Sequence, residues 1–180
     1  MKSQRGFTLV ELLIALVVVL GILFIVAVSA RSAFQDANGK KVTNVVLVLD
    51  GRIREAYAQR FDHWDLTNDS AIKEGIVPPE WVTPGTTTIQ PSTGLLISLQ
   101  PSTGTYAGSR YRMTVNGFIE PGSCSSIIRT VTPGVLSLSV KQHGTGTTIP
   151  VSTARGTVPS GSALATACYR GIDQIVLENA

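Results

Sequence analysis

FTLVELLIALVVVLGILFIVAVSA occupies residues 7–30, and its only charged side chain is that of Glu11. The part that follows Glu11 would be about 28 Å long as a helix, which matches the hydrocarbon core of a bilayer. A carboxylate inside such a run costs a few kcal/mol at mid-membrane and less near an end. We therefore expect a membrane-embedded helix whose acid needs a compensating positive charge.

The residues in front of this run suggest how that charge could arise. KSQRG occupies residues 2–6 and carries two basic side chains. A cut after Gly6 would expose a new amino group on Phe7. On a neighbouring copy of the chain, that amino group would offer Glu11 the positive charge it needs.

KSQRG followed by FTLVELLIAL resembles the type IV prepilin signal, and the resemblance covers residues 1–30. The shared features are a short basic leader ending in Gly6, a phenylalanine after the cut, a glutamate as fifth mature residue and an unbroken apolar helix. The resemblance implies cleavage between Gly6 and Phe7 by a prepilin peptidase, N-methylation of Phe7, and packing of the helices into a filament core. It also implies that Glu11 pairs with the amino group of a neighbouring copy's Phe7.

An ordinary secretory signal peptide and a plain membrane anchor are the alternatives. A signal peptide has an apolar core of about 7–15 residues and a small-residue cleavage site. Residues 28–30, VSA, would serve as such a site, but the apolar run is longer and contains Glu11. A plain anchor fits the length and explains neither Glu11 nor the leader. All three interpretations predict that Lys2 and Arg5 keep the start of the chain cytoplasmic and the remainder outside.

Beyond the leader and anchor, about 150 residues remain, enough for one domain with its own core. Only 15% of the chain is charged, and Gly, Ser, Thr and Pro are common, which is typical of a β-rich domain with many turns. The formal net charge of +3 falls to +1 when Lys2 and Arg5 leave with the leader. The exported part has no basic run beyond Lys40-Lys41, so we expect no nucleic-acid binding.

A helical pattern continues past the apolar run. Between residues 31 and 60, apolar residues recur three and four apart, which gives one face to bury and one face to solvate. They are Val42, Val45, Val46, Leu49, Ile53, Ala56 and Tyr57. We expect one helix of about 50 residues over 7–60, with 7–30 forming the transmembrane segment and later the filament core. Asn38-Gly39 is the place for a bend or a break between two helices.

The remaining residues, 61–180, are expected to form a globular head. Short runs with strand character alternate there with turns. The candidate strands cover residues 94–100, 111–118, 135–142, 147–153 and 173–178. Residues 68–75 have the pattern of a capped short helix, and 124–131 are expected to form a helix between strands. The domain organisation is therefore a cleaved leader at 1–6, the long helix at 7–60 and the head.

Four motifs follow one another along the head: LTNDSAIKEGIVP at 66–78, VNGF at 115–118, CSSII at 124–128 and TACYRG at 166–171. Their order is similar to that of type IVb pilins, particularly the thin-pilus pilins of conjugative plasmids and the bundle-forming and toxin-coregulated kinds. The resemblance implies an α+β pilin fold, in which the long helix packs on an antiparallel sheet and a disulfide joins a helix after a middle strand to the C-terminal region. Cys124 and Cys168 fall where that bond would be. The six-residue leader and Phe7 depart from this group and are more like type IVa pilins and pseudopilins.

The chain contains two cysteines, Cys124 and Cys168. An even count in an exported domain predicts one disulfide, and two separate buried thiols are the alternative. We expect no zinc site, because His63 and His143 are isolated and neither cysteine belongs to a C-x-x-C pair. No other metal or cofactor is expected.

Two clusters contain the side-chain types that catalysis or ligand binding would need. DHWD at residues 62–65 is the densest group of titratable side chains, and it is interpreted either as a calcium or general-base site or as solvated loop and capping residues. RYR at 110–112 interleaves charge with an aromatic ring, but on a strand the tyrosine would lie on the face opposite the arginines. We therefore expect no enzyme and no catalytic residues.

The resemblance implies a structural subunit, or pilin, of a type IV pilus (a fimbrium). The precursor would lie in the bacterial inner membrane, with its N-terminus cytoplasmic and its head periplasmic, and would then join an extracellular fibre. The expected partners are prepilin peptidase, further copies in a homopolymeric filament, the assembly machinery with its inner-membrane platform protein, and minor pilins. The fibre would serve adhesion, aggregation or conjugation. The alternatives are a type II secretion pseudopilin or minor pilin and, from another class, a membrane-tethered binding domain.

Overall fold

A computed structural model describes residues 9–60, 62–103 and 108–180. The chain forms two compact units, Met1–Gln35 and Asp36–Ala180. Over its described residues, the first unit is the N-terminal part of one helix. The second unit contains the rest of that helix together with the head.

The long helix, α1, spans Leu9–Tyr57 without interruption and is 49 residues long. This confirms the single long helix and excludes a break at Asn38-Gly39. Gly39 is buried, and a Cβ atom added there would lie 3.4 Å from the Cα and Cβ atoms of Ser123. The glycine therefore permits a close approach of two segments rather than a bend.

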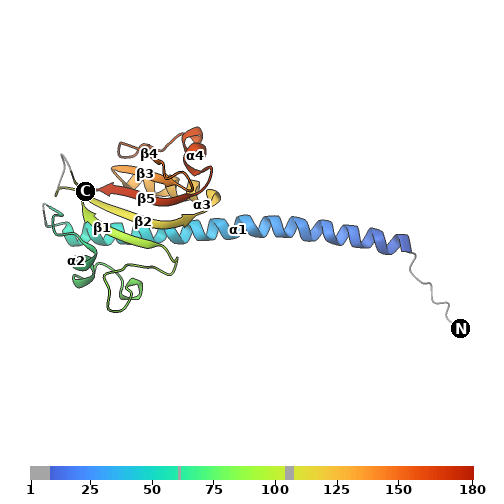
Figure 1. Ribbon diagram of the computed structural model, residues 1–180, viewed down its shortest axis with the longest axis horizontal. Helices are drawn as coiled ribbons and strands as arrows, with labels where there is room; N and C mark the ends of the chain where they lie inside the picture. Colours follow the sequence, from blue (N-terminus) through green and yellow to red (C-terminus); the bar gives the residue numbers. More distant parts are fainter. Residues whose placement is uncertain (1–8, 61, 104–107) are drawn as a thin grey trace. The chain divides into compact units, whose positions relative to one another are not determined.

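The head contains a five-stranded antiparallel sheet with the order β1-β2-β5-β3-β4 (Figure 1). Its strands are β1 Leu96–Pro101, β2 Tyr111–Ile119, β3 Ser137–Gln142, β4 Thr148–Ser152 and β5 Ile172–Asn179. Each was expected from the sequence, with ends that agree within two residues. The last strand in the sequence lies at the centre of the sheet, so Ile175 pairs with both Val115 on β2 and Val140 on β3.

Short helices surround the sheet. They are α2 Asn68–Lys73, α3 Pro121–Val131, α4 Gly161–Cys168 and the 3₁₀ helices η1 Pro79–Trp81 and η2 Thr132–Gly134. Thr67 and Ser70 form a capping box at the start of α2. Proline occupies the first turn of α3, where no backbone donor is needed. The helix α4 was not expected from the sequence.

The core lies between α1 and one face of the sheet. Six α1 side chains with helical spacing are buried, namely Val42, Val45, Val46, Leu49, Ile53 and Tyr57. On β5 the buried side chains alternate with half-buried ones, as expected for a strand with one covered face. The buried apolar side chains of α1 and β5 belong to one contiguous cluster, which includes Met113, Leu138 and Leu177 from the strands.

Candidate assembly site

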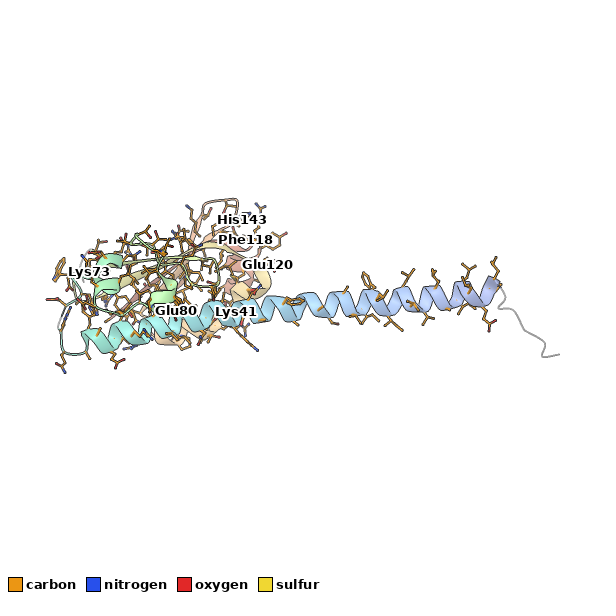
Figure 2. The ribbon with its side chains drawn as sticks, turned by 90° about the horizontal axis from the view of Figure 1, so that it is seen from below. Lys41, Lys73, Glu80, Phe118, Glu120 and His143 are labelled. Carbon is orange, nitrogen blue, oxygen red and sulfur yellow. A yellow bond between two sulfur atoms is a disulfide. The ribbon has the colours of Figure 1, made fainter. Side chains whose placement is uncertain are left out.

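The N-terminal part of α1, Leu9–Ala27, is long and apolar enough to cross a membrane. These 19 residues have a mean hydropathy of 3.2, and all of them are exposed. Leu9 is 78% exposed and Phe24 is 71% exposed, and such side chains stand out all around the helix (Figure 2). Since an apolar surface of this size is unfavourable in water, lipid or other apolar helices must cover it.

Glu11 lies in the first turn of α1, and it is exposed on this apolar segment. The positive end of the helix dipole favours a carboxylate at that position. In lipid or among apolar helices, however, a carboxylate also needs a cation close by. Gly6 and Phe7, which flank the expected cleavage point, lie outside the described residues.

A polar network around Asp50 joins the C-terminal half of α1 to the sheet. Asp50 Oδ1 accepts hydrogen bonds from the Tyr111 hydroxyl on β2 and from Asn179 Nδ2 on β5, the latter at 2.7 Å. Asp50 Oδ2 lies 2.9 Å from Arg54 Nε, and the two side chains are 16% and 33% exposed. Arg54 Nη2 and Asn179 Nδ2 both donate to the carbonyl oxygen of Gly134, at 2.6 and 3.1 Å. The position of α1 on the sheet is therefore fixed by directional bonds as well as by apolar packing.

Burial raises the pKa of Tyr111, and the negative charge of Asp50 raises it further. The hydroxyl therefore stays protonated and remains a hydrogen-bond donor across the ordinary pH range. From the sequence, Asp50 and Arg54 are only a helical pair four residues apart. Their connection to Tyr111 and Asn179 depends on the fold, so no local pattern could have revealed it.

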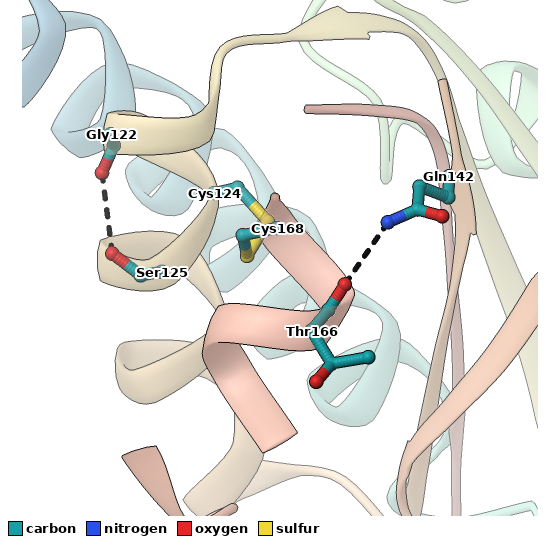
Figure 3. Close-up of a disulfide and its surroundings, with 6 residues drawn as sticks. All are labelled: Gly122, Cys124, Ser125, Gln142, Thr166 and Cys168. Atoms are coloured by element: carbon teal, nitrogen blue, oxygen red, sulfur yellow. Dashed lines mark hydrogen bonds between the residues drawn. A yellow bond between two sulfur atoms is a disulfide. The ribbon is translucent and has the colours of Figure 1, made fainter. Parts of the chain in front are cut away.

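The disulfide between Cys124 and Cys168 is present and joins α3 to α4 (Figure 3). The two Cα atoms are 5.7 Å apart, and 44 positions separate the residues in the sequence. Beside it, Gln142 Nε2 donates to the carbonyl oxygen of Thr166 at 3.0 Å and connects the end of β3 to α4. The prediction of one disulfide linking a helix after a middle strand to the C-terminal region is confirmed.

The DHWD cluster does not form a converging catalytic group. His63 is 7% exposed, and its ring stacks on Tyr57 at 4.8 Å between centroids and tilts against Tyr111 at 5.2 Å. Burial lowers the pKa of this imidazole. Asp65 instead accepts a 2.9 Å hydrogen bond from the Tyr57 hydroxyl, and Asp62 is exposed. In the described parts of the chain, no group of three or more His, Cys, Asp or Glu residues is arranged to hold a metal ion.

Tyr111 and Arg112 of the RYR segment begin β2, with the tyrosine facing the core as the alternation predicted. Tyr111 is 1% exposed and faces the core. Arg112 is half-buried and donates from Nη2 and Nε to Glu178 Oε1, at 2.6 and 3.1 Å. The guanidinium of Arg112 is therefore used inside the head, where it joins β2 to β5.

Asn68 is a structural residue that sequence reasoning did not identify. Its Nδ2 donates to the carbonyl oxygens of Thr87 and Ile97, each at 3.1 Å. Its Oδ1 accepts from the backbone nitrogen of Leu99 at 2.7 Å. The first residue of α2 thereby holds the edge strand β1 and the loop beside it.

Comparison with protein families identifies the N-terminal segment. A family model described as "Prokaryotic N-terminal methylation motif" matches residues 1–30, which include Gly6, Phe7 and Glu11. A search of curated proteins found no match. The matched motif, the apolar helix within it and the α+β head with its disulfide support a prepilin-type signal on a membrane-anchored, type IV pilin-like or pseudopilin precursor.

Proposed function

We propose that this chain is a structural subunit of a type IV pilus. The observation that carries the proposal is the combination of a methylation motif at residues 1–30 with an apolar helix that the chain itself leaves uncovered. A lone membrane anchor would need the exposed apolar side chains but not the motif. A fibre subunit needs both, because the processed helices must leave the lipid and cover one another.

The precursor waits in the inner membrane, with its leader in the cytoplasm and its head in the periplasm. Prepilin peptidase cuts between Gly6 and Phe7, which removes the charges of Lys2 and Arg5, and Phe7 is then N-methylated. Glu11 of an incoming subunit pairs with the Phe7 amino group of a neighbouring copy. An unpaired carboxylate among apolar helices is penalised and a paired one is tolerated, so this pair sets the register of assembly.

Apolar packing of residues 7–30 supplies the cohesion of the fibre, and the heads cover its outside. The platform protein and the rest of the assembly machinery lift each subunit from the membrane, and minor pilins join the same fibre. The surface formed by residues 61–180 then decides what the fibre touches in adhesion, aggregation or conjugation. The disulfide between α3 and α4 and the order of motifs along the head favour the type IVb group.

A type II secretion pseudopilin or a minor pilin is the second candidate. The observation in its favour is the short leader with Phe7 after the cut, which is more like type IVa pilins and pseudopilins. Shearing of cells separates the possibilities. A major pilin is abundant in the sheared surface fraction, whereas a pseudopilin stays with the cell envelope.

Mass spectrometry of the mature N-terminus tests the proposal against other classes of protein. A pilin or pseudopilin begins at methylated Phe7. A chain that begins at Arg31 has been processed as an ordinary secreted protein. A chain that retains Met1 is a membrane-tethered domain, and either of these last two results would overturn the proposal.

A further inference from the structure

The charges of the head are separated along the sequence. Residues 61–80 contain five acids and one base, Lys73, for a formal net charge of −4. The acids are Asp62, Asp65, Asp69, Glu74 and Glu80. Residues 121–172 contain no acid and four bases, for a formal net charge of +4 with His143 neutral. These bases are Arg129, Lys141, Arg155 and Arg170.

The acidic segment lies beside β1 at one edge of the sheet, and the basic segment includes β4 at the opposite edge (Figure 1). On one side α2 packs against the edge strand β1, and the segment 79–90 continues the sheet outward through the bridges Val82–Ile89 and Ile89–Ile97. On the other side α4 packs against β3 and the edge strand β4. Four strand spacings separate β1 from β4, or about 19 Å. We call residues 62–80 the acidic edge and residues 121–172 the basic edge.

The basic edge is not neutralised by the head itself. Arg129, Lys141, Arg155 and Arg170 are exposed, and none of them takes part in an ion pair with another described residue. On the acidic edge, which includes the labelled residues Lys73 and Glu80 in Figure 2, Asp65 and Glu74 pair with Arg60, and Asp69 pairs with Lys73. Asp62 and Glu80 are exposed and have no such partner among the described residues.

Each edge also exposes an aromatic side chain. Trp64, on the acidic edge, is 61% exposed. Tyr169, on the basic edge, is 76% exposed and lines a groove of about 320 Å³ between α3 and α4, together with Arg129 and Leu164. An aromatic side chain surrounded by charges is a common composition for a surface that binds another protein.

We propose that the acidic edge of one head docks on the basic edge of the next copy of the chain. The inference rests on the proposed function, since it adds a second contact to a fibre built on α1. A copy of the same chain is the partner that the charges favour, because the two edges carry net charges of opposite sign. Like edges repel each other, so a symmetric dimer through either edge is disfavoured. A contact between two different edges leaves one free edge at each end and extends into an open polymer.

Charge reversal in the full chain, expressed in cells, tests the contact. The first variant, Asp62→Lys with Glu80→Lys, makes the acidic edge less negative. The second, Arg155→Glu with Arg170→Glu, makes the basic edge less positive. Each should reduce the sheared fibre at least about tenfold, because the altered edge then carries no net charge and the attraction between the two edges is lost.

Two controls separate charge from folding. Asp62→Glu with Glu80→Asp and Arg155→Lys with Arg170→Lys keep every charge and should leave the fibre yield unchanged. The amount of chain with an intact Cys124–Cys168 disulfide in the membrane fraction reports whether each variant folds. Where a charge-reversed chain does not accumulate, a neutral variant replaces it: Asp62→Asn with Glu80→Gln, or Arg155→Gln with Arg170→Gln. The neutral variants should reduce the yield of sheared fibre less than the reversed ones.

The outcomes distinguish this contact from the proposed function. If the wild-type chain gives no fibre and no methylated N-terminus, the proposed function itself is wrong. If the wild-type chain gives fibre and both reversed or neutral variants do so equally well, the docking of the two edges is overturned. A loss in only one of the two single-edge variants would also overturn it, since the contact needs both edges.

Discussion

Asp50 in the long helix α1 and Asn179 at the end of the last strand β5 are joined by a 2.7 Å hydrogen bond across 129 positions of sequence. The same carboxylate accepts a bond from the Tyr111 hydroxyl and lies 2.9 Å from Arg54 Nε. Apolar packing alone allows a helix to slide or rotate on a sheet, whereas these bonds have one geometry. The network therefore fixes which face of the C-terminal half of α1 packs on the sheet.

Loss of the Asp50 carboxylate should destabilise the head. Asp50→Ala leaves the Tyr111 hydroxyl without its acceptor and removes the ion pair of Arg54. We expect the free energy of unfolding to fall by about 3 kcal/mol. Urea unfolding of the detergent-solubilised chain measures the change. Asp50→Asn, which keeps the size and one acceptor oxygen, should cost less, and an unchanged midpoint in Asp50→Ala would show that the network contributes nothing.

Removal of the disulfide should also destabilise the head. With 44 positions between the cysteines, Cys124→Ser combined with Cys168→Ser should lower the free energy of unfolding by about 4 kcal/mol, as chain entropy predicts for a loop of this length. Unfolding of the wild-type chain with and without a reductant gives an independent measurement. The reductant should shift the wild-type midpoint and leave that of the double variant in place. A midpoint that is the same for both chains under oxidising conditions contradicts the prediction.

The stability of the head should fall in mild acid because of His63. Burial between Tyr57 and Tyr111 lowers the pKa of its imidazole below the ordinary 6.5, so the unfolded chain binds a proton more readily than the folded one. The stabilising effect is complete above pH 6.5 and is lost as pH falls from there through the lowered pKa of the folded state. His63→Gln should remove this slope, measured as the urea midpoint between pH 7.5 and pH 5. Above pH 7 the urea midpoints of the wild-type chain and of the variant should depend on pH in the same way. If the midpoint of the variant falls as steeply in acid as that of the wild-type chain, groups other than His63 cause the fall.

Much of this fold follows from local patterns in the sequence. The helical spacing of six apolar residues from Val42 to Tyr57 predicts the buried face of α1, and short runs with strand character between turns predict all five strands. Ala56, which was expected on the same face, is exposed. The helix α4 escaped prediction because Gly161–Cys168 consists mainly of small residues and buries only Leu164, Ala167 and Cys168. Its place depends on the disulfide to Cys124, 44 positions away in the sequence, and on contact with β3 and β4.

The candidate site also contains residues that the sequence alone indicates and contacts that only the fold creates. Gly6, Phe7 and Glu11 form a local motif, so the sequence alone indicates them. The contact of Asp50 with Tyr111 and Asn179 spans 61 and 129 positions, and no local propensity encodes it. The central position of β5 is also a property of the whole sheet, since its two neighbours come from different parts of the chain. The separation of charge is visible in the sequence, but its position at opposite edges of the sheet needs the strand order.

Glu11→Val should leave membrane insertion intact and impair fibre assembly. Valine makes the helix more apolar, so the precursor still enters the membrane and prepilin peptidase still acts after Gly6. The incoming subunit then has no carboxylate to pair with the Phe7 amino group, which leaves a desolvated cation in the fibre core. Fractionation and shearing of cells measure the two steps separately.

Glu55→Val is the matched control for that change. Glu55 is an exposed acid on the same helix, but it lies in the second compact unit, outside the apolar segment. The control chain should insert, mature and assemble at close to the wild-type level. Glu11→Asp keeps the charge on a shorter side chain and should retain part of the assembly. Normal piliation by Glu11→Val would show that the acid is not the group that pairs with the mature N-terminus, and apolar packing alone would then have to set the register.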